Sequence, residues 1–246
     1  DKQENRSIFE NAGLITKLSL DNTGNQAAFL ATEDTTERKI YSLFYHGNNA
    51  TRAITDTIST DLTSGYTASP NGKIYFSRND ERLFFGVAPK PRVEPKDTIP
   101  DDEKVKLDMW HWQDPLLQPQ QLKQLKREQN RTYLTVFHIK TNRVLQLSSH
   151  CLNDVRPLGK GNAELALGFN SKPYQKRMSW EMPGYRDMYS VNIETGERKL
   201  LLTAIQSRCN LSPTGKYAYW YNNADSLWYA KDVATEKWYC LPVNLA

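Results

Sequence analysis

Three short stretches of the sequence hold side chains that could bind a ligand. Trp110-His111-Trp112 places an imidazole between two indoles, as in an aromatic ligand site, and the same alternation suits side chains that anchor a segment on a sheet. Trp180, Tyr185 and Arg186 form an aromatic and basic stretch that could line a peptide groove or pack between sheets. The run 101–103 is acidic and could hold a cation or a peptide amino group, although such runs are more often solvated loops.

Motifs of the common hydrolases are absent. A nucleophile elbow requires Gly two residues to either side of Ser, and no serine has that setting. A zinc protease helix requires two His at helical spacing with Glu between them, and none of the histidines, His46, His111, His138 and His150, is so placed. A phosphate-binding loop, a dinucleotide glycine triad and the Ser-x-Asp-x-Gly-x-Thr-Trp turn of sialidases are also missing. We therefore expect no catalytic residue, no metal site and no cofactor here.

Composition excludes further classes. Hydrophobic residues make up 39% of the 246 residues, and their longest uninterrupted run is five, as in 27–31, whereas a membrane span needs about 20. We therefore expect no membrane span. The net charge of +4 is too small for the basic field of a protein that binds duplex nucleic acid. Eight Phe, 13 Tyr and six Trp indicate a chain rich in β-structure.

The three cysteines indicate neither a disulfide scaffold nor a zinc site. Cys151, Cys209 and Cys240 are far apart and never form a Cys-x-x-Cys pair, so we expect all three to be buried apolar side chains. The chain begins at Asp1 without an initiator Met or an apolar leader, which leads us to expect a segment of a longer polypeptide.

A ten-residue pattern recurs four times and predicts the elements that carry these side chains. It places Gly or Asp in a turn at positions 24, 80, 161 and 215, followed by an apolar strand. Gly and Asp tolerate the positive φ of a tight hairpin turn, and the apolar run suits a strand buried on both faces. Ser69-Pro70-Asn71-Gly72 offers a competing turn, but we favour the later one because Leu83-Phe84-Phe85 supplies the second strand.

A second pattern predicts outer hairpins around Thr141, Thr195 and Thr235. The interval between the second and third repeats is longer because an insertion over 88–131 is Pro-rich and then helix-like, with a helix expected from Pro119 to Gln129. What remains is a single domain over 1–246 with four units, at approximately 14–55, 72–147, 151–203 and 206–241. Four-stranded units repeated in this way predict an all-β fold, a partial β-propeller of about four antiparallel blades, because a sandwich or solenoid gives no reason to repeat the turn.

Several segments resemble one known family. Lys106–Pro115 with Leu117–Gln121, Arg131–His138 and Tyr185–Gly196 resemble the N-terminal β-propeller of bacterial prolyl oligopeptidase-family (S9) serine peptidases, over most of Leu14–Leu241. The resemblance implies a C-terminal α/β-hydrolase domain with a Ser, Asp and His triad as partner. It also implies short peptides as substrates, a propeller that restricts their entry, and export to the periplasm.

The sequence departs from that family in two respects. No residue of the catalytic triad can be assigned to any position. The adjacent Glu-Glu pair with which dipeptidyl members of the family bind the substrate's α-amine is also absent. Three hypotheses therefore compete: a substrate-filtering segment of an S9 peptidase, a non-catalytic propeller that binds a protein or glycan partner, and a propeller enzyme acting on carbohydrate. The third requires acidic or His residues on the inner strands, and the expected inner strands, 27–30, 83–85 and 217–221, are apolar.

Overall fold

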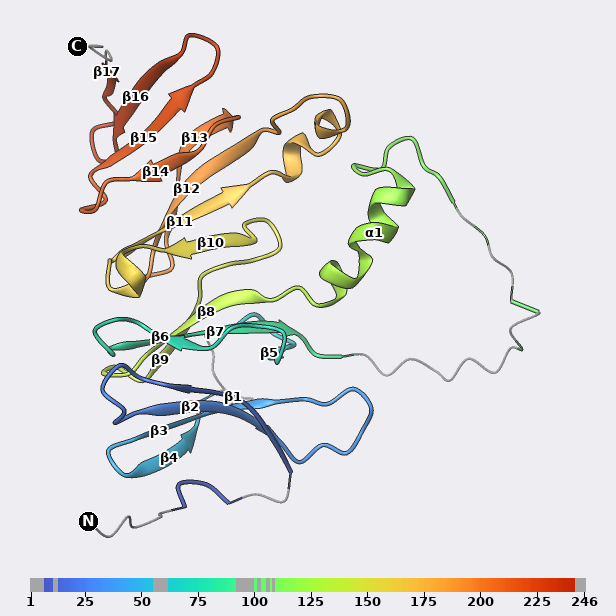
Figure 1. The fold of residues 1–246 in the computed structure, drawn as a ribbon, viewed down its shortest axis with the longest axis vertical. Coiled ribbons are helices and arrows are strands. Elements are labelled where there is room, and N and C mark those ends of the chain that lie inside the picture. Colours follow the sequence, from blue (N-terminus) through green and yellow to red (C-terminus); the bar gives the residue numbers. More distant parts are fainter. Residues whose placement is uncertain are drawn as a thin grey trace.

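The structure is a computed structural model, and it describes residues 7–10, 13–54, 62–91, 100, 103–104, 107 and 109–241. Its strands form four antiparallel sheets, which follow one another along the chain and stack face against face (Figure 1). Sheets of consecutive strands stacked in this way form a partial β-propeller, so the predicted all-β fold is confirmed.

The strands of each sheet lie in chain order. Sheet 1 contains β1 (Leu14–Leu20), β2 (Ala27–Thr32), β3 (Ser42–Gly47) and β4 (Ala50–Ala53). Sheet 2 contains β5 (Tyr66–Ala68), β6 (Tyr75–Phe76), β7 (Arg82–Pro89), β8 (Tyr133–His138) and β9 (Arg143–Gln146). Sheet 3 contains β10 (Asp154–Pro157), β11 (Leu165–Asn170), β12 (Arg186–Asn192) and β13 (Arg198–Ile205). Sheet 4 contains β14 (Cys209–Leu211), β15 (Tyr217–Asn222), β16 (Leu227–Asp232) and β17 (Trp238–Leu241).

The repeated turn lies between β1 and β2 in sheet 1, β6 and β7 in sheet 2, β10 and β11 in sheet 3, and β14 and β15 in sheet 4. Its key residue has a positive φ in all four copies: +77° at Gly24, +57° at Asp80, +89° at Gly161 and +73° at Gly215. This left-handed region is the conformation for which Gly and Asp were expected at these positions. The predicted hairpin turns are therefore confirmed.

The second sheet begins earlier than the expected position 72. Its first strand is split into β5 and β6, which both pair with β7, so the sheet starts at Tyr66. The two turns that competed in the sequence are both present, because the turn at 69–72 interrupts this strand and the later turn closes the hairpin. Gly72 is required in the interruption, since a Cβ there would lie 2.7 Å from the Cα of Gly86.

Three apolar layers join neighbouring sheets. In sheets 2 and 3, which have a neighbour on each side, one central strand contributes side chains to the layers on both faces. In β7, Leu83 and Phe85 pack toward sheet 1, whereas Phe84 packs toward sheet 3. Alternate side chains of a strand point to opposite faces, so an uninterrupted apolar run is what a sheet buried on both sides needs. Sheets 3 and 4 meet in the same manner, with Met188 against Trp220.

The insertion carries one helix, α1 (Gln118–Gln129), one residue longer at its start than expected. Pro119 occupies the first turn, where its missing N–H costs no hydrogen bond. No residue of the helix is buried, and the two leucines of its apolar stripe, Leu122 and Leu125, are exposed. In the described part of the chain, this helix is too short and too polar to cross a membrane.

A polar contact around Arg82 joins sheets 2 and 3. The buried guanidinium donates from Nε and Nη2 to Glu194 Oε1, at 3.1 and 2.6 Å, and from Nη1 to the carbonyls of Gly161 and Ala163, both at 2.9 Å. A forked guanidinium is suited to several acceptors at once. The contact therefore fixes the turn and outer hairpin of sheet 3 against the start of β7.

His138 lies beside this contact. Its Nε2–H donates to the carbonyl of Ile193 at 3.1 Å, and Nδ1 lies 3.3 Å from Glu194 Oε2. Burial of the ring lowers the pKa of His138 below its ordinary value near 6.5, despite the opposing attraction of Glu194. Burial therefore disfavours the protonated ring in the folded chain.

This burial predicts a loss of stability in mild acid. As pH falls below about 6.5, the unfolded chain binds a proton at His138 more readily than the folded chain, so the free energy of unfolding decreases. Urea unfolding between about pH 7.5 and 5.5 should show this decrease, and His138→Gln should reduce it. A wild-type chain that gains stability relative to the variant as the pH falls over this range would contradict a lowered pKa of His138.

The cysteines differ from the expectation that all three are buried. Cys209 is buried in β14, but Cys151 and Cys240 are exposed because one lies in a loop and the other in the last strand of sheet 4. Burial raises the pKa of the Cys209 thiol to about 11.

This difference predicts selective alkylation. Iodoacetamide at about pH 8 should modify Cys151 and Cys240 in the folded chain, because only they are accessible, and should reach Cys209 after unfolding. Peptide mass spectrometry measures each site. Alkylation of Cys209 at the rate of the other two thiols would contradict its burial.

Candidate functional site

One side of the stacked sheets carries the longest connections, and we call it the loop side (Figure 1). It includes α1 and the connection at 171–185, which contains the short helical turns η2 (Lys172–Tyr174) and η3 (Arg177–Ser179). The insertion that carries α1 meets this connection, because Lys176 Nζ lies 5.7 Å from the centre of the Trp112 ring. Burial, with repulsion from Arg131, lowers the pKa of Lys172, whose Nζ lies 2.7 Å from His150 Nε2.

The structure leaves the Trp-His-Trp stretch on the loop side. Trp110 and Trp112 are 65% and 82% exposed, so neither indole is packed into a sheet. His111 is stacked on Trp112 with ring centres 6.3 Å apart, and its Nδ1 accepts a hydrogen bond from the N–H of Gln113. The contact with Lys176 joins this stretch to another loop rather than to a strand. Anchoring of the insertion by Trp110, His111 and Trp112 stays a prediction.

Trp180, Tyr185 and Arg186 lie in or next to the 171–185 connection but do not converge on one point. Trp180 is 72% exposed. The Tyr185 ring is covered by Arg177, whose guanidinium carbon lies 4.6 Å from the ring centre. Arg186 instead begins β12, and its guanidinium lies 5.2 Å from the centre of the Phe169 ring. A role for all three in contacting substrate stays a prediction.

Arg186 does not itself line a pocket, but it contacts Ser207, which does. Its Nη2 donates to the carbonyl of Ser207 at 3.3 Å, while its buried Nε makes no hydrogen bond with the described residues. The hydroxyl of Ser207 is likewise buried without a hydrogen-bond partner among them. Gln206 Nε2 donates to the carbonyl of Pro183 at 3.0 Å, and this hydrogen bond holds the 171–185 connection next to Gln206 and Ser207.

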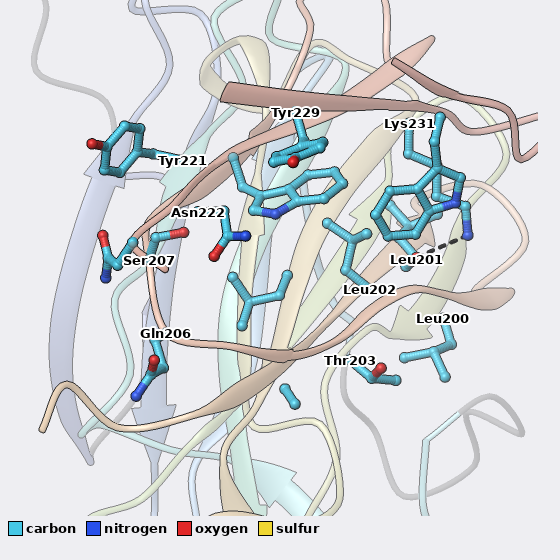
Figure 2. A pocket seen from close by; sticks show the side chains of 15 residues that line it. Leu200, Leu201, Leu202, Thr203, Gln206, Ser207, Tyr221, Asn222, Tyr229 and Lys231 are labelled. Atoms are coloured by element: carbon cyan, nitrogen blue, oxygen red, sulfur yellow. Dashed lines mark hydrogen bonds between the residues drawn. The ribbon is translucent and has the colours of Figure 1, made fainter. Parts of the chain in front are cut away.

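The pocket has a volume of about 460 Å³ and lies between β13 and sheet 4 (Figure 2). Leu202, Trp220 and Trp238 provide apolar walls, and polar groups gather at the other end around Gln206, Ser207 and Asn222, as Figure 2 shows. The sequence analysis missed this site. The signal that could have indicated it is the concentration of aromatic residues in the last repeat, but the same residues suit a core.

A second hollow follows the first strands of sheets 2 and 3. Two adjoining depressions of about 670 and 510 Å³ share Tyr75 and Pro157 in their walls. Basic side chains border them, and these are Lys73, Arg78, Arg156 and Lys160. One carboxylate, Asp154, accepts hydrogen bonds from Arg156 at 2.9 and 2.6 Å. This groove is open and predominantly basic.

The expected inner strands are placed differently by the structure. The segments 27–30, 83–85 and 217–221 belong to β2, β7 and β15, the second strands of their sheets. The first and last strands form the edges of each sheet, and the groove described above follows the first strands of sheets 2 and 3. Polar and basic side chains therefore border the groove, although the strands named in the sequence analysis are apolar.

The described residues contain no group of three or more His, Cys, Asp or Glu side chains positioned to hold a metal ion. Asp101 and Asp102 of the acidic run lie outside the described residues. The described surface offers an apolar pocket with a polar end, a basic groove, and exposed indoles on the loop side.

No protein-family model and no curated protein sequence matches this chain. Among solved structures, it is similar to TolB from Acinetobacter baumannii, with 12% identity, a TM-score of 0.33 and coverage of 98% of this chain and 46% of that one. A prolyl endopeptidase has 12% identity and a TM-score of 0.39, with 94% and 29% covered. The β-propeller domain of the Trilobed protease from Pyrococcus furiosus has 9% identity and a TM-score of 0.37, with 94% and 57% covered. The chain therefore spans less than two thirds of each protein, and these TM-scores are too low to relate their activities to this chain.

Proposed function

We propose that these 246 residues are a propeller segment of a prolyl oligopeptidase-family serine peptidase, and that they restrict which peptides reach a catalytic domain elsewhere in a longer chain. The partner would be an α/β-hydrolase domain that carries the catalytic triad. Its serine would attack a peptide carbonyl, which breaks the C–N bond, releases the amine part of the substrate with a proton from the histidine and leaves an acyl-enzyme. Water would then hydrolyse the acyl-enzyme and release the carboxylic acid part. Export to the periplasm belongs to the same proposal.

One observation carries this proposal: two segments that resemble the family border the same side of the sheets. Trp112, in the first segment, contacts Lys176, and Tyr185, at the start of the second, contacts Arg177 of the same connection. The loop side is thus a continuous surface suited to meeting another domain. The basic groove along the first strands supports the substrate class, because peptides present carbonyl and carboxylate oxygens to cationic side chains.

Active-site labelling tests the proposal. The full-length protein that contains this chain should react with a fluorophosphonate probe and cleave short peptides in preference to long ones, because the propeller limits entry. The 246-residue chain alone should not react, and replacement of the labelled serine by Ala should abolish both signals. A full-length protein that neither labels nor cleaves peptides would remove the proposal.

The pocket between β13 and sheet 4 favours a second candidate, a non-catalytic propeller that binds a protein or glycan partner. Its aromatic walls and polar end have the character of a recognition site. A full-length protein that lacks a fluorophosphonate-reactive serine but retains a bound partner after purification would favour this second function.

A further inference from the structure

We propose that the pocket between β13 and sheet 4 binds the C-terminal residue of a peptide, with a bulky apolar side chain in the pocket and the carboxylate at Ser207, beside Arg186. This inference goes beyond the peptidase proposal, since the site lies away from the basic groove and requires no catalytic domain. It rests on three observations: the shape of the apolar end, the unpartnered groups at the polar end, and the position of Lys231 at the opposite end from Ser207.

The apolar end is preformed. Trp220 is stacked on Tyr229 with ring centres 5.7 Å apart, and Trp238 meets Trp220 edge to face at 5.1 Å. Trp220 is buried, whereas Trp238 remains 57% exposed and presents apolar surface to an incoming group. Because these rings already hold one another, a bound side chain need not order them. The volume, about 460 Å³, is within the usual range of small-ligand pockets.

The polar end contains Ser207, Arg186 lies beside it, and each has one group that lacks a partner. Ser207 Oγ and Arg186 Nε are both buried and without hydrogen bonds among the described residues, although such groups are nearly always paired. Arg186 is also adjacent in space to Ser207, through its hydrogen bond to that residue's carbonyl. A ligand that fills this end must therefore supply hydrogen-bond acceptors, and the guanidinium favours a negative one.

The cation that lines the pocket, Lys231, is already engaged. Lys231 Nζ donates to the carbonyl of Leu201 at 3.0 Å, at the opposite end of the view in Figure 2, and lies 3.8 Å from Glu236. By contrast, Arg186 forms no ion pair within the part of the chain that the structure describes. A carboxylate is thus favoured at the Ser207 end and an apolar group between the indoles and leucines, which is the arrangement of a peptide's last residue.

Titration of the 246-residue chain with short peptides tests this assignment. Tryptophan fluorescence or calorimetry should detect binding of acetyl-Gly-Ala-Leu as the free acid. The C-terminal amide should bind about tenfold more weakly, because it loses a charge-assisted contact. Acetyl-Gly-Ala-Gly should bind more weakly still, since it has nothing to place in the apolar end. Maltotriose serves as the probe for a carbohydrate site.

Two variants and a matched control separate binding from folding. Ser207→Ala should weaken binding of the free acid about five- to tenfold without lowering the melting temperature, because it removes a buried hydroxyl that has no partner. Trp238→Ala should abolish binding. Trp228→Ala is the control, because Trp228 is also exposed on sheet 4 but does not line the pocket.

Three results would overturn the proposal. These are equal affinity for acid and amide, no effect of Ser207→Ala on the affinity for the acid, or binding of maltotriose that displaces the peptide. Failure of the full-length protein to label with fluorophosphonate would leave these binding results unchanged, so the two proposals can fail independently.

Discussion

Replacement of Arg82 by Ala is expected to lower the free energy of unfolding by about 3 kcal/mol, since it removes four hydrogen bonds that join sheets 2 and 3. Most of the loss comes from the carbonyls of Gly161 and Ala163, which would lack a donor between the sheets. Glu194 contributes less because its side chain is 47% exposed and can turn to water. Urea unfolding monitored by tryptophan fluorescence measures the change.

Two other variants control this experiment. Arg127→Ala removes an exposed guanidinium on α1 and should change stability by less than about 0.5 kcal/mol. Arg82→Lys should recover only part of the loss, because one ammonium group cannot reach a carboxylate and two carbonyls with the geometry of the fork. An Arg82→Ala chain as stable as the Arg127→Ala chain would show that this contact does not hold the sheets together.

Replacement of Gly161 by Ala is expected to cost about 3 kcal/mol, because strain and steric overlap act together. The residue has a φ of +89°, which an L-residue with a Cβ adopts unfavourably. A Cβ at this position would also lie 2.7 Å from Cε2 of the buried Phe84 and 3.1 Å from Cβ of Ser77. Phe84 is in the layer between sheets 2 and 3 and has little room to move.

Gly24→Ala is the matched control for this substitution. Gly24 occupies the equivalent turn of sheet 1 with a φ of +77°, but a Cβ there would meet no atom within 4 Å. It should therefore cost only the conformational strain, about 1 kcal/mol. The difference between the two variants, measured by denaturant or thermal unfolding, isolates the contact with sheet 2. Equal losses would contradict the close approach of the Gly161 turn to Phe84.

Much of the fold could be predicted because its determinants are local. Gly24, Gly161 and Gly215 mark turns that require a positive φ, and Asp80 can adopt the same conformation. The apolar run Leu83-Phe84-Phe85 predicted a strand buried on both sides, since consecutive apolar side chains of a strand point to opposite faces. The start of sheet 2 was misplaced because Pro70 and Gly72 are typical of a connection between strands, whereas here they interrupt one strand.

The contacts between sheets could not be predicted, because they join residues far apart in sequence. Arg82 and Glu194 are 112 positions apart, and the patterns that contain them describe local turns rather than contacts between sheets. The exposure of Cys240 follows from its place in β17, an edge strand whose four residues are all exposed, and composition alone does not indicate that place. The pocket also escaped prediction, because Trp220 and Trp238 have the sequence character of core residues and Ser207 has that of a loop residue.

The stacking of the sheets in chain order can be tested by disulfide trapping in a background with the native cysteines replaced. The turn of sheet 1 touches that of sheet 2, since the N–H of Asn22 donates to Asp80 Oδ1 at 3.0 Å, and the turn of sheet 2 touches that of sheet 3 through Asn79 and Asn162 at 3.0 Å. We predict cross-links in Asn22→Cys/Asp80→Cys and in Asn79→Cys/Asn162→Cys, and none in Asn22→Cys/Asn162→Cys. A cross-link in the third pair, or none in the first two, would contradict the arrangement on which every site described above depends.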